Sequence, residues 1–209
     1  MEKVQKTRRT RRVDVRRLVF TALMAALSIV LAEPPLAFKV GIMPSFMTFD
    51  FSDVPAMLAS MTMGPVSGVF VCLIKNIFGC FTTKTACVGE LSNFILSAAL
   101  VFPAGLIAHR NGKYIRAVVG CLSGTVLMAL MSIPSNYFLV FPAYGTAFGL
   151  PIDALVGYYQ KILPSVENLI QCLIIFNVPF TLVKGLCAAI ISILLYKKLR
   201  PVFSGIYRE

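Results

Sequence analysis

The chain has 209 residues, of which 57% are hydrophobic and only 14% are charged, and its mean hydropathy is +0.81. An ordinary soluble domain carries about 25% charged residues, so this composition argues against a water-soluble protein and favours one embedded in a lipid bilayer. Because about 20 apolar residues cross the hydrocarbon core, a single domain of this length has room for roughly six spans.

The net charge of +11 is concentrated at three places along the chain. Eight basic residues lie in the first 17 positions, three lie in a short polar gap near the middle (Arg110, Lys113 and Arg116), and four follow the last apolar run. An even number of predicted spans separates each basic segment from the next, so the positive-inside rule places all three in the cytoplasm, with both termini. The charge therefore indicates membrane topology, and no nucleic-acid partner is expected.

These patterns predict an all-α integral membrane protein, a bundle of six transmembrane helices. It comprises a basic cytoplasmic arm at residues 1–17, a transmembrane substrate-binding domain at 18–196 and a basic cytoplasmic tail at 197–209. The first apolar run follows basic residues, as in a signal peptide, but five further spans come after it, so we expect it to be retained.

In chain order, the predicted spans cover residues 18–33, about 50–64, 66–80, 88–108, 117–141 and 168–196. Gly64-Pro65 is a tight-turn signal that reverses the chain between the second and third spans, both of which are short for a bilayer. The outer segment at 142–166 contains three prolines and is long enough to hold a short interfacial helix.

In this topology the polar residues of the spans gather toward the outer side of the membrane. They are Glu33, Asp50, Asp53, Lys75, Asn76, Glu90, Asn93, Asn136, Tyr137, Thr181 and Lys184. A charged group at the centre of a membrane helix costs about 2.5–3.5 kcal/mol, so such groups face the bundle interior and pair with each other or meet a ligand. The acids stand near the outer rim, which favours a pocket for a polar organic molecule over a proton or ion relay. A competing interpretation is that Glu90, Lys75 and Lys184 only form ion pairs that hold the bundle together.

Ala22 and Ala26 form a small-x-x-x-small pair in the first span, a spacing that lets another helix approach closely. It serves either packing within the bundle or docking of a partner membrane protein. The sequence contains no phosphate-binding loop of the G-x-x-x-x-G-K-[ST] type, no C-x-x-C pair and one histidine, His109. We therefore expect no catalytic residues, no metal site and no ATPase site of its own.

Several short motifs, in this order and spacing, resemble the riboflavin-specific substrate-binding (S) component of energy-coupling factor (ECF) transporters. They are Asp-Phe-Ser-Asp-Val-Pro-Ala at 50–56, Gly-Pro at 64–65, Lys-Asn at 75–76, Gly-Glu-Leu-Ser-Asn-Phe at 89–94, Asn-Tyr-Phe at 136–138, Pro-Ala-Tyr at 142–144 and Asn-Val-Pro-Phe-Thr-Leu-Val-Lys-Gly at 177–185. The resemblance covers nearly the whole chain.

The resemblance implies a multi-pass protein of the bacterial cytoplasmic membrane that captures riboflavin from outside and carries no cofactor. Its implied partners are the lipid bilayer, a transmembrane scaffold (T) component and two ABC ATPase subunits, whose ATP hydrolysis reorients the S component and releases the vitamin inward. Ala22 and Ala26 match the family's alanine motif, which contacts the scaffold.

The resemblance also implies a flavin site in the outer half of the bundle. The implied polar contacts are Glu90, Asn93, Asn136, Thr181 and Lys184. Lys184 and Asn136 are expected to donate to ring oxygens. The ribityl hydroxyls suit Glu90, Asn93 or Lys39, and the side chains expected to cover the ring faces are Leu36, Phe46 and Tyr137.

Thr181 stands where the family's last-span motif usually has Asn. Either Asn177, one turn earlier, holds the flavin instead, or the ligand is a flavin relative such as FMN or roseoflavin. The sequence pattern is also compatible with an S component for another vitamin. A stand-alone ion-coupled carrier fits it less well, because mid-membrane acids or two related halves would be expected.

Overall fold

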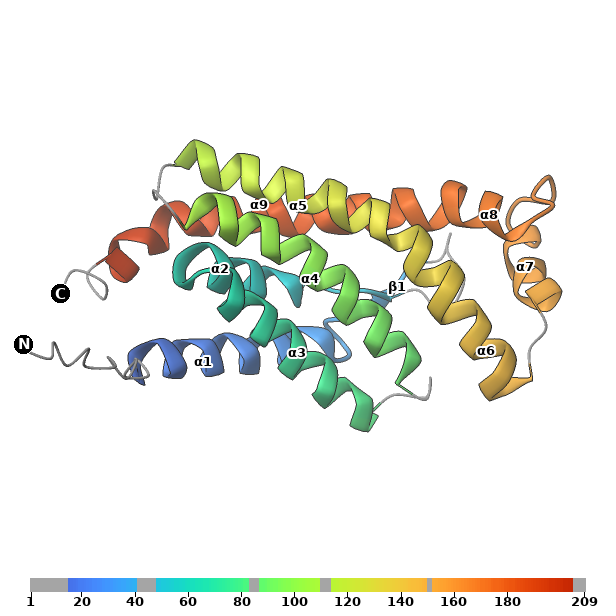
Figure 1. The fold of residues 1–209 in the computed structure, drawn as a ribbon, viewed down its shortest axis with the longest axis horizontal. Coiled ribbons are helices and arrows are strands. Elements are labelled where there is room, and N and C mark those ends of the chain that lie inside the picture. The colour runs from blue at the N-terminus through green and yellow to red at the C-terminus, as the bar shows by residue number, and fades with distance from the viewer. Residues whose placement is uncertain (1–14, 41–47, 83–86, 110–113, 150–151, 205–209) are drawn as a thin grey trace, which may run out of the picture.

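The computed structural model describes residues 15–40, 48–82, 87–109, 114–149 and 152–204. Over these residues the chain is mostly helical, and its long helices lie roughly along one axis (Figure 1). The apolar composition explains this choice, because a helix satisfies its backbone hydrogen bonds internally and needs no water to do so.

The helices are α1 (Val15–Ala32), α2 (Asp53–Met63), α3 (Pro65–Thr82), α4 (Val88–Ala108), α5 (Tyr114–Pro134), α6 (Phe141–Phe148), α7 (Ile152–Gln160), α8 (Leu169–Cys172) and α9 (Val178–Ser204). Two π-helical segments, η1 (Ser135–Val140) and η2 (Leu173–Asn177), join α5 to α6 and α8 to α9 without a break. Between α1 and α2, the two-residue strands β1 (Phe38–Lys39) and β2 (Thr48–Phe49) pair antiparallel, with Phe38 opposite Phe49.

Five helical stretches of the described chain are long and apolar enough to cross a membrane. They are Val15–Ala32, Pro65–Thr82, Val88–Ala108, Tyr114–Thr146 and Leu169–Leu199. They correspond to the predicted first, third, fourth, fifth and sixth spans. The predicted interfacial segment contains a short helix, α7.

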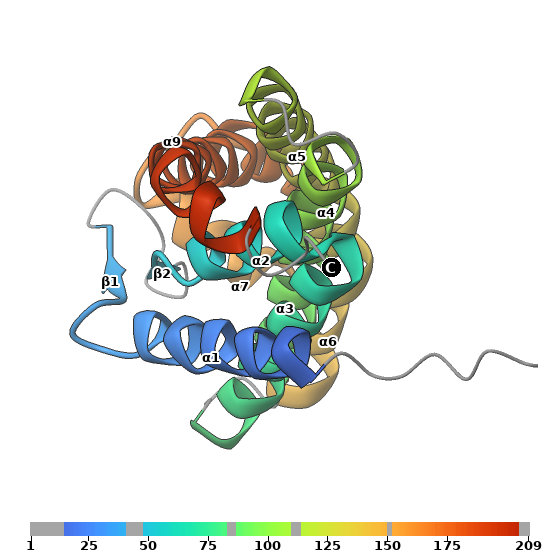
Figure 2. The same ribbon diagram turned by 90° about the vertical axis from the view of Figure 1, so that its left-hand side faces the viewer.

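The predicted second span is a short internal helix. Its 11 residues form α2, which at 1.5 Å per residue is about 16 Å long and cannot cross a bilayer alone. Every residue of α2 is buried. Figure 2 shows why: α2 lies near the middle of the bundle, between α1, α3, α4 and α9. The neighbouring helices, rather than lipid, surround it, so the expected count of six spans is not confirmed.

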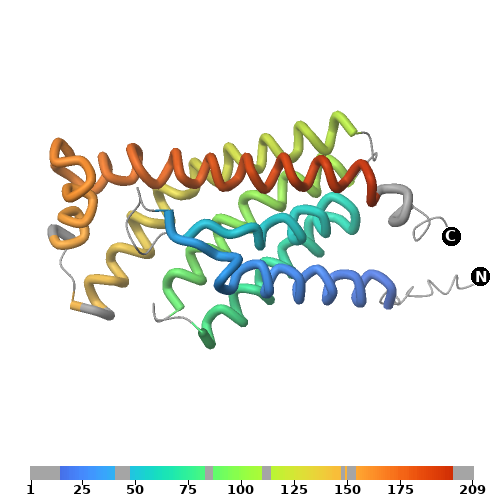
Figure 3. The backbone as a smooth tube through the Cα atoms, turned by 180° about the vertical axis from the view of Figure 1, so that it is seen from behind, coloured from blue at the N-terminus to red at the C-terminus, as the bar shows by residue number. Residues whose placement is uncertain are grey.

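The first turn of α1 and the last turns of α9 lie at one end of the bundle, and α7 and α8 lie at the other (Figures 1 and 3). The ends of α2 and α4 join the first group. Arg17 on α1 donates from its guanidinium to the carbonyl of Met63 and, through Nε, to Ser67 Oγ at 3.1 Å. His109 Nδ1 lies 3.0 Å from the carbonyl oxygen of Thr62. These contacts satisfy the last carbonyls of α2, which a helix end leaves unpaired.

Close backbone contacts set the spacing of the helices around α4. A Cβ added to Gly124 of α5 would lie 2.0 Å from the carbonyl oxygen of Leu100. One added to Gly105 of α4 would lie 2.2 Å from Ser60 Oγ, which itself bonds the carbonyl of Val101 at 2.5 Å. Glycine is therefore required where α4 meets α5 and α2. The predicted turn at Gly64-Pro65 is also present, with Gly64 at a φ of 99°.

Candidate functional site

A cavity of about 350 Å³ lies in the half of the bundle nearer α7 and α8. Its walls come from the start of α4, the end of α5, η1, α6, η2 and the start of α9, closed on one side by β2 and the residues that follow it. The lining residues are Thr48, Asp50, Gly89, Glu90, Ser92, Asn93, Leu96, Met128, Asn136, Val140, Tyr144, Asn177, Phe180, Thr181 and Lys184. This volume falls in the range of small-molecule sites, which combine apolar walls with a few placed polar groups.

Six of the predicted site residues line this cavity: Glu90, Asn93, Asn136, Asn177, Thr181 and Lys184. They come from α4, η1, η2 and α9, which are far apart in the sequence. All of these except Asn177 belong to the polar set that the topology placed toward one side of the membrane, and the structure brings these five together at one cavity. That each of them contacts a ligand stays a prediction.

The remaining predicted residues are not in the described lining. Tyr137 is 38% exposed and its ring packs edge-on against Phe138, with centroids 5.0 Å apart. Successive helical residues point in different directions, so Asn136 faces the cavity and Tyr137 turns away. Leu36 and Lys39 are exposed, Leu36 beyond the end of α1 and Lys39 on β1. Phe46 lies outside the described residues.

The two π-helical segments carry part of the cavity wall. η1 contributes Asn136 and Val140, and η2 contributes Asn177. A π-turn inserts an extra residue into the helix, which redirects the side chains around it, and such turns are frequent at functional sites. Hydrophobic periodicity gave no sign of these segments.

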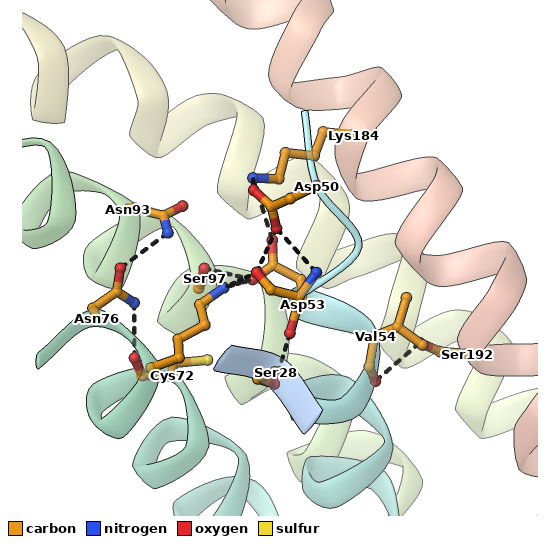
Figure 4. Close-up of polar contacts among 12 residues, drawn as sticks. Ser28, Asp50, Asp53, Val54, Cys72, Asn76, Asn93, Ser97, Lys184 and Ser192 are labelled. Atoms are coloured by element: carbon orange, nitrogen blue, oxygen red, sulfur yellow. Dashed lines mark hydrogen bonds and ion pairs between the residues drawn. The ribbon is translucent and has the colours of Figure 1, made fainter. Parts of the chain in front are cut away.

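Two ion pairs lie next to each other, and one of them belongs to the cavity lining. Figure 4 shows Lys184 with Asp50, and Asp53 beside them. Lys184 Nζ lies 2.7 Å from Asp50 Oδ2, and Lys75 Nζ lies 2.5 Å from Asp53 Oδ1. The pairs adjoin, because Lys184 Nζ is also 4.0 Å from Asp53 Oδ2. Two ammonium groups face two carboxylates, so the cluster is neutral in sum. The two lysines do form ion pairs, Lys75 with Asp53 and Lys184 with Asp50. The competing interpretation named Glu90 as the acid, and the described ion pairs of these two lysines do not include it.

The two pairs differ in their exposure. The side chains of Lys75 and Asp53 are 1% and 0% exposed and do not line the cavity. Those of Lys184 and Asp50 are each 8% exposed and do line it. The inner pair therefore holds α2 against α3, whereas the outer pair forms part of the cavity wall. Sequence reasoning placed Asp50 among the polar residues of the spans but not in the site, because the sequence gives no pairing.

Among the described residues, each asparagine side chain of the cavity lining makes one hydrogen bond. Asn136 Nδ2 donates to the carbonyl of Ser132 at 2.7 Å, and Asn93 Nδ2 donates to Asn76 Oδ1 at 2.9 Å. Tyr159, buried on α7, donates from its hydroxyl to Asn177 Oδ1 at 2.9 Å. These bonds fix each amide while leaving its other polar atom for a ligand. Burial raises the pKa of the Tyr159 phenol, so it stays a proton donor at neutral pH.

The alanine pair of the first span lies on the exposed face of α1. Ala22 and Ala26 are exposed, whereas Ala25 between them is 2% exposed and part of the core. Large apolar side chains flank them on the same face, among them Leu23 and Leu27. Ala22 and Ala26 are therefore not used for packing among the described helices. Their small side chains are exposed where a partner helix or lipid can contact α1.

A sequence model of the family described as "ECF transporter, substrate-specific component" matches residues 16–196. The chain is 30% identical over 185 residues to the "Riboflavin transporter RibU" of Staphylococcus aureus, covering 88% of this chain and 90% of that protein. It is 28% identical over 192 residues to the "Riboflavin transporter FmnP" of Bacillus subtilis, covering 90% and 94%.

A solved structure has the same fold. It is described as "Structure and mechanism of the S component of a bacterial ECF transporter" and superposes with a TM-score of 0.69 at 28% sequence identity. The match covers 91% of this chain and 98% of the other.

Proposed function

Because the chain belongs to the substrate-specific (S) components of ECF transporters, we propose that it binds riboflavin and delivers it across the cytoplasmic membrane. The names of the relatives support the choice of ligand. The observation that carries the proposal is the cavity, where the Lys184–Asp50 pair converges with the amides of Asn136 and Asn177.

The cavity suits a flavin chemically. The isoalloxazine ring offers two carbonyl oxygens and an imide N–H, which ammonium, carboxylate and amide groups bind directly. Leu96, Met128 and Phe180 supply apolar surface for the ring faces. Glu90 and Asn93, at the start of α4, suit the ribityl hydroxyls.

Thr181 and Asn177 both line the cavity, which supports the view that Asn177 supplies the amide that Thr181 cannot. Riboflavin is favoured over FMN, because a phosphate needs unpaired cations. Lys184 is the one cationic side chain in the described lining, and Asp50 already neutralises it.

The proposed orientation has the cavity facing outward, with both termini in the cytoplasm. The first turn of α1, the end of α4 and the last turns of α9 lie at the end of the bundle away from the cavity (Figure 1). Basic residues cluster in the sequence next to these points, which supports a cytoplasmic location for that end. In this arrangement six helices, with α2 shielded by its neighbours, form the membrane domain.

For transport, we infer that the chain docks on a transmembrane T component that carries two ABC ATPase subunits. The exposed Ala22 and Ala26 on α1 support this, because small residues let a partner helix approach closely. ATP hydrolysis in those subunits would reorient the bundle and turn the cavity inward.

The proposal is tested by titrating detergent-purified protein with riboflavin while measuring flavin fluorescence. We expect saturable quenching at one site per chain, with weaker binding in Asn136→Ala. Phe138→Ala is the matched control, because this residue lies two positions along the same π-helical segment and is 75% exposed. If wild-type protein neither contains flavin nor quenches it, the ligand is another vitamin. Uptake without ATP or a coupling module would instead favour an ion-coupled carrier.

A further inference from the structure

We propose that Asp50 is a specificity-determining residue that acts together with Lys184 on the edge of a cyclic imide in the ligand. Asp50 accepts a hydrogen bond from the imide N–H, and Lys184 donates one to the carbonyl oxygen next to it. This inference rests on the proposed function and deepens it, because it names the part of the flavin that Asp50 and Lys184 recognise.

The geometry places an acceptor and a donor side by side. Asp50 Oδ2 and Lys184 Nζ are 2.7 Å apart, and both residues line the cavity. The inner pair, Lys75 and Asp53, is sealed away from it. The N–H of an imide and the oxygen of the carbonyl next to it, separated by one carbon atom, point the same way and can meet such a pair.

The hydrogen bonds of Asp50 leave an acceptor position on Oδ2. Its Oδ1 accepts two bonds from Ser52, one from the backbone N–H at 2.9 Å and one from the hydroxyl. Its Oδ2 accepts one described bond, from Lys184. A carboxylate oxygen accepts two hydrogen bonds and an ammonium group donates three. Ser52 therefore fixes the carboxylate, while Oδ2 and Lys184 each keep capacity for a ligand.

Asp53 provides a second, more distant counter-charge for Lys184. Its Oδ2 is buried and has no hydrogen-bond donor among the described residues, yet it lies 4.0 Å from Lys184 Nζ. Lys184 therefore stays close to a second carboxylate when Asp50 also accepts a hydrogen bond from the ligand. Because the two lysines and two aspartates balance one another, this part of the wall suits a neutral group with complementary polarity, which a cyclic imide provides.

A purely positioning role makes a different prediction. If Asp50 only holds Lys184 in place, every flavin loses affinity equally when Asp50 is changed. If Asp50 accepts a hydrogen bond from the imide N–H, changing Asp50 lowers the affinity less for a flavin that lacks this N–H. N3-methylriboflavin lacks it and keeps both carbonyls.

The experiment measures the dissociation constants of riboflavin and N3-methylriboflavin by fluorescence quenching, for wild-type protein and Asp50→Ala. A hydrogen bond to a charged acceptor contributes about 10- to 100-fold in affinity, so wild type should prefer riboflavin by about that factor. In Asp50→Ala the preference should shrink to below about 3-fold, because the acceptor is lost.

Two outcomes would overturn the assignment: equal binding of both flavins by wild type, or an undiminished preference in Asp50→Ala. If Asp50→Ala fails to fold, Asp50→Asn supplies a variant of the same shape for the same comparison, and equal binding of both flavins by wild type overturns the assignment without any variant. Wild-type protein that binds neither flavin would instead refute the proposed ligand.

Discussion

Replacing Lys75 with Met removes one partner of an ion pair that is sealed inside the bundle. Asp53 would then stay buried with one described donor, Ser97, whose hydroxyl bonds Oδ1 at 2.6 Å. Breaking a buried pair in this way costs about 3–5 kcal/mol. For a chain of this size, each kcal/mol lowers the unfolding temperature by about 2–4 °C, so Lys75→Met should lower it by roughly 6–20 °C.

Lys184→Met should be milder, although it also removes one lysine from one pair. Asp50 keeps both bonds from Ser52 and borders the cavity, where water can reach it. Removing one partner of a buried hydrogen-bonding group costs about 1–3 kcal/mol. Lys184→Met should therefore lose ligand binding more than stability, and Lys75→Met should do the reverse.

Thermal unfolding in detergent can be followed with a thiol-reactive fluorophore, because Cys72, Cys121 and Cys172 are buried in the folded chain. The matched control is the double variant Lys75→Met/Asp53→Leu. Replacing both partners of a buried pair with apolar residues is often neutral, so it should recover most of the lost stability. The reasoning fails if Lys184→Met lowers the unfolding temperature as much as Lys75→Met does, or if the double variant unfolds no later than the single one.

Three other predictions concern other parts of the fold. Gly124→Ala should lower the unfolding temperature in the same thermal assay, because its Cβ would meet the Leu100 carbonyl and overpacking costs about 1–3 kcal/mol. Gly157→Ala is the control and should leave the unfolding temperature unchanged, because nothing lies within 4 Å of its Cβ. Tyr159→Phe should weaken riboflavin binding about 5- to 100-fold in a fluorescence titration by freeing Asn177, and unchanged binding would exclude this link. Ala22→Leu should abolish riboflavin uptake by cells yet spare binding to purified protein; intact uptake would refute docking through α1.

The amino-acid sequence determined those features that depend on local chemistry. Long apolar runs and the turn signal at Gly64-Pro65 predict the long helices. A segment in lipid must satisfy its own backbone hydrogen bonds, so this requirement depends on each segment alone. The depth of a polar residue within a run also follows from counting along a helix. For this reason Glu90, Asn136 and Lys184 were predicted on the same side, and they do meet at one cavity.

Tertiary structure decided which groups pair and which surfaces stay exposed. Four intramembrane charges allow several pairings, and only the packing of α2 against α3 and α9 selects Lys75 with Asp53 and Lys184 with Asp50. The burial of α2, the turning away of Tyr137 and the exposure of Ala22 likewise depend on neighbours that a one-dimensional pattern does not specify. Hydrophobicity along a chain fixes how deep a residue lies in the membrane, but its direction around the helix axis, and therefore its partner, is set by the helices packed beside it.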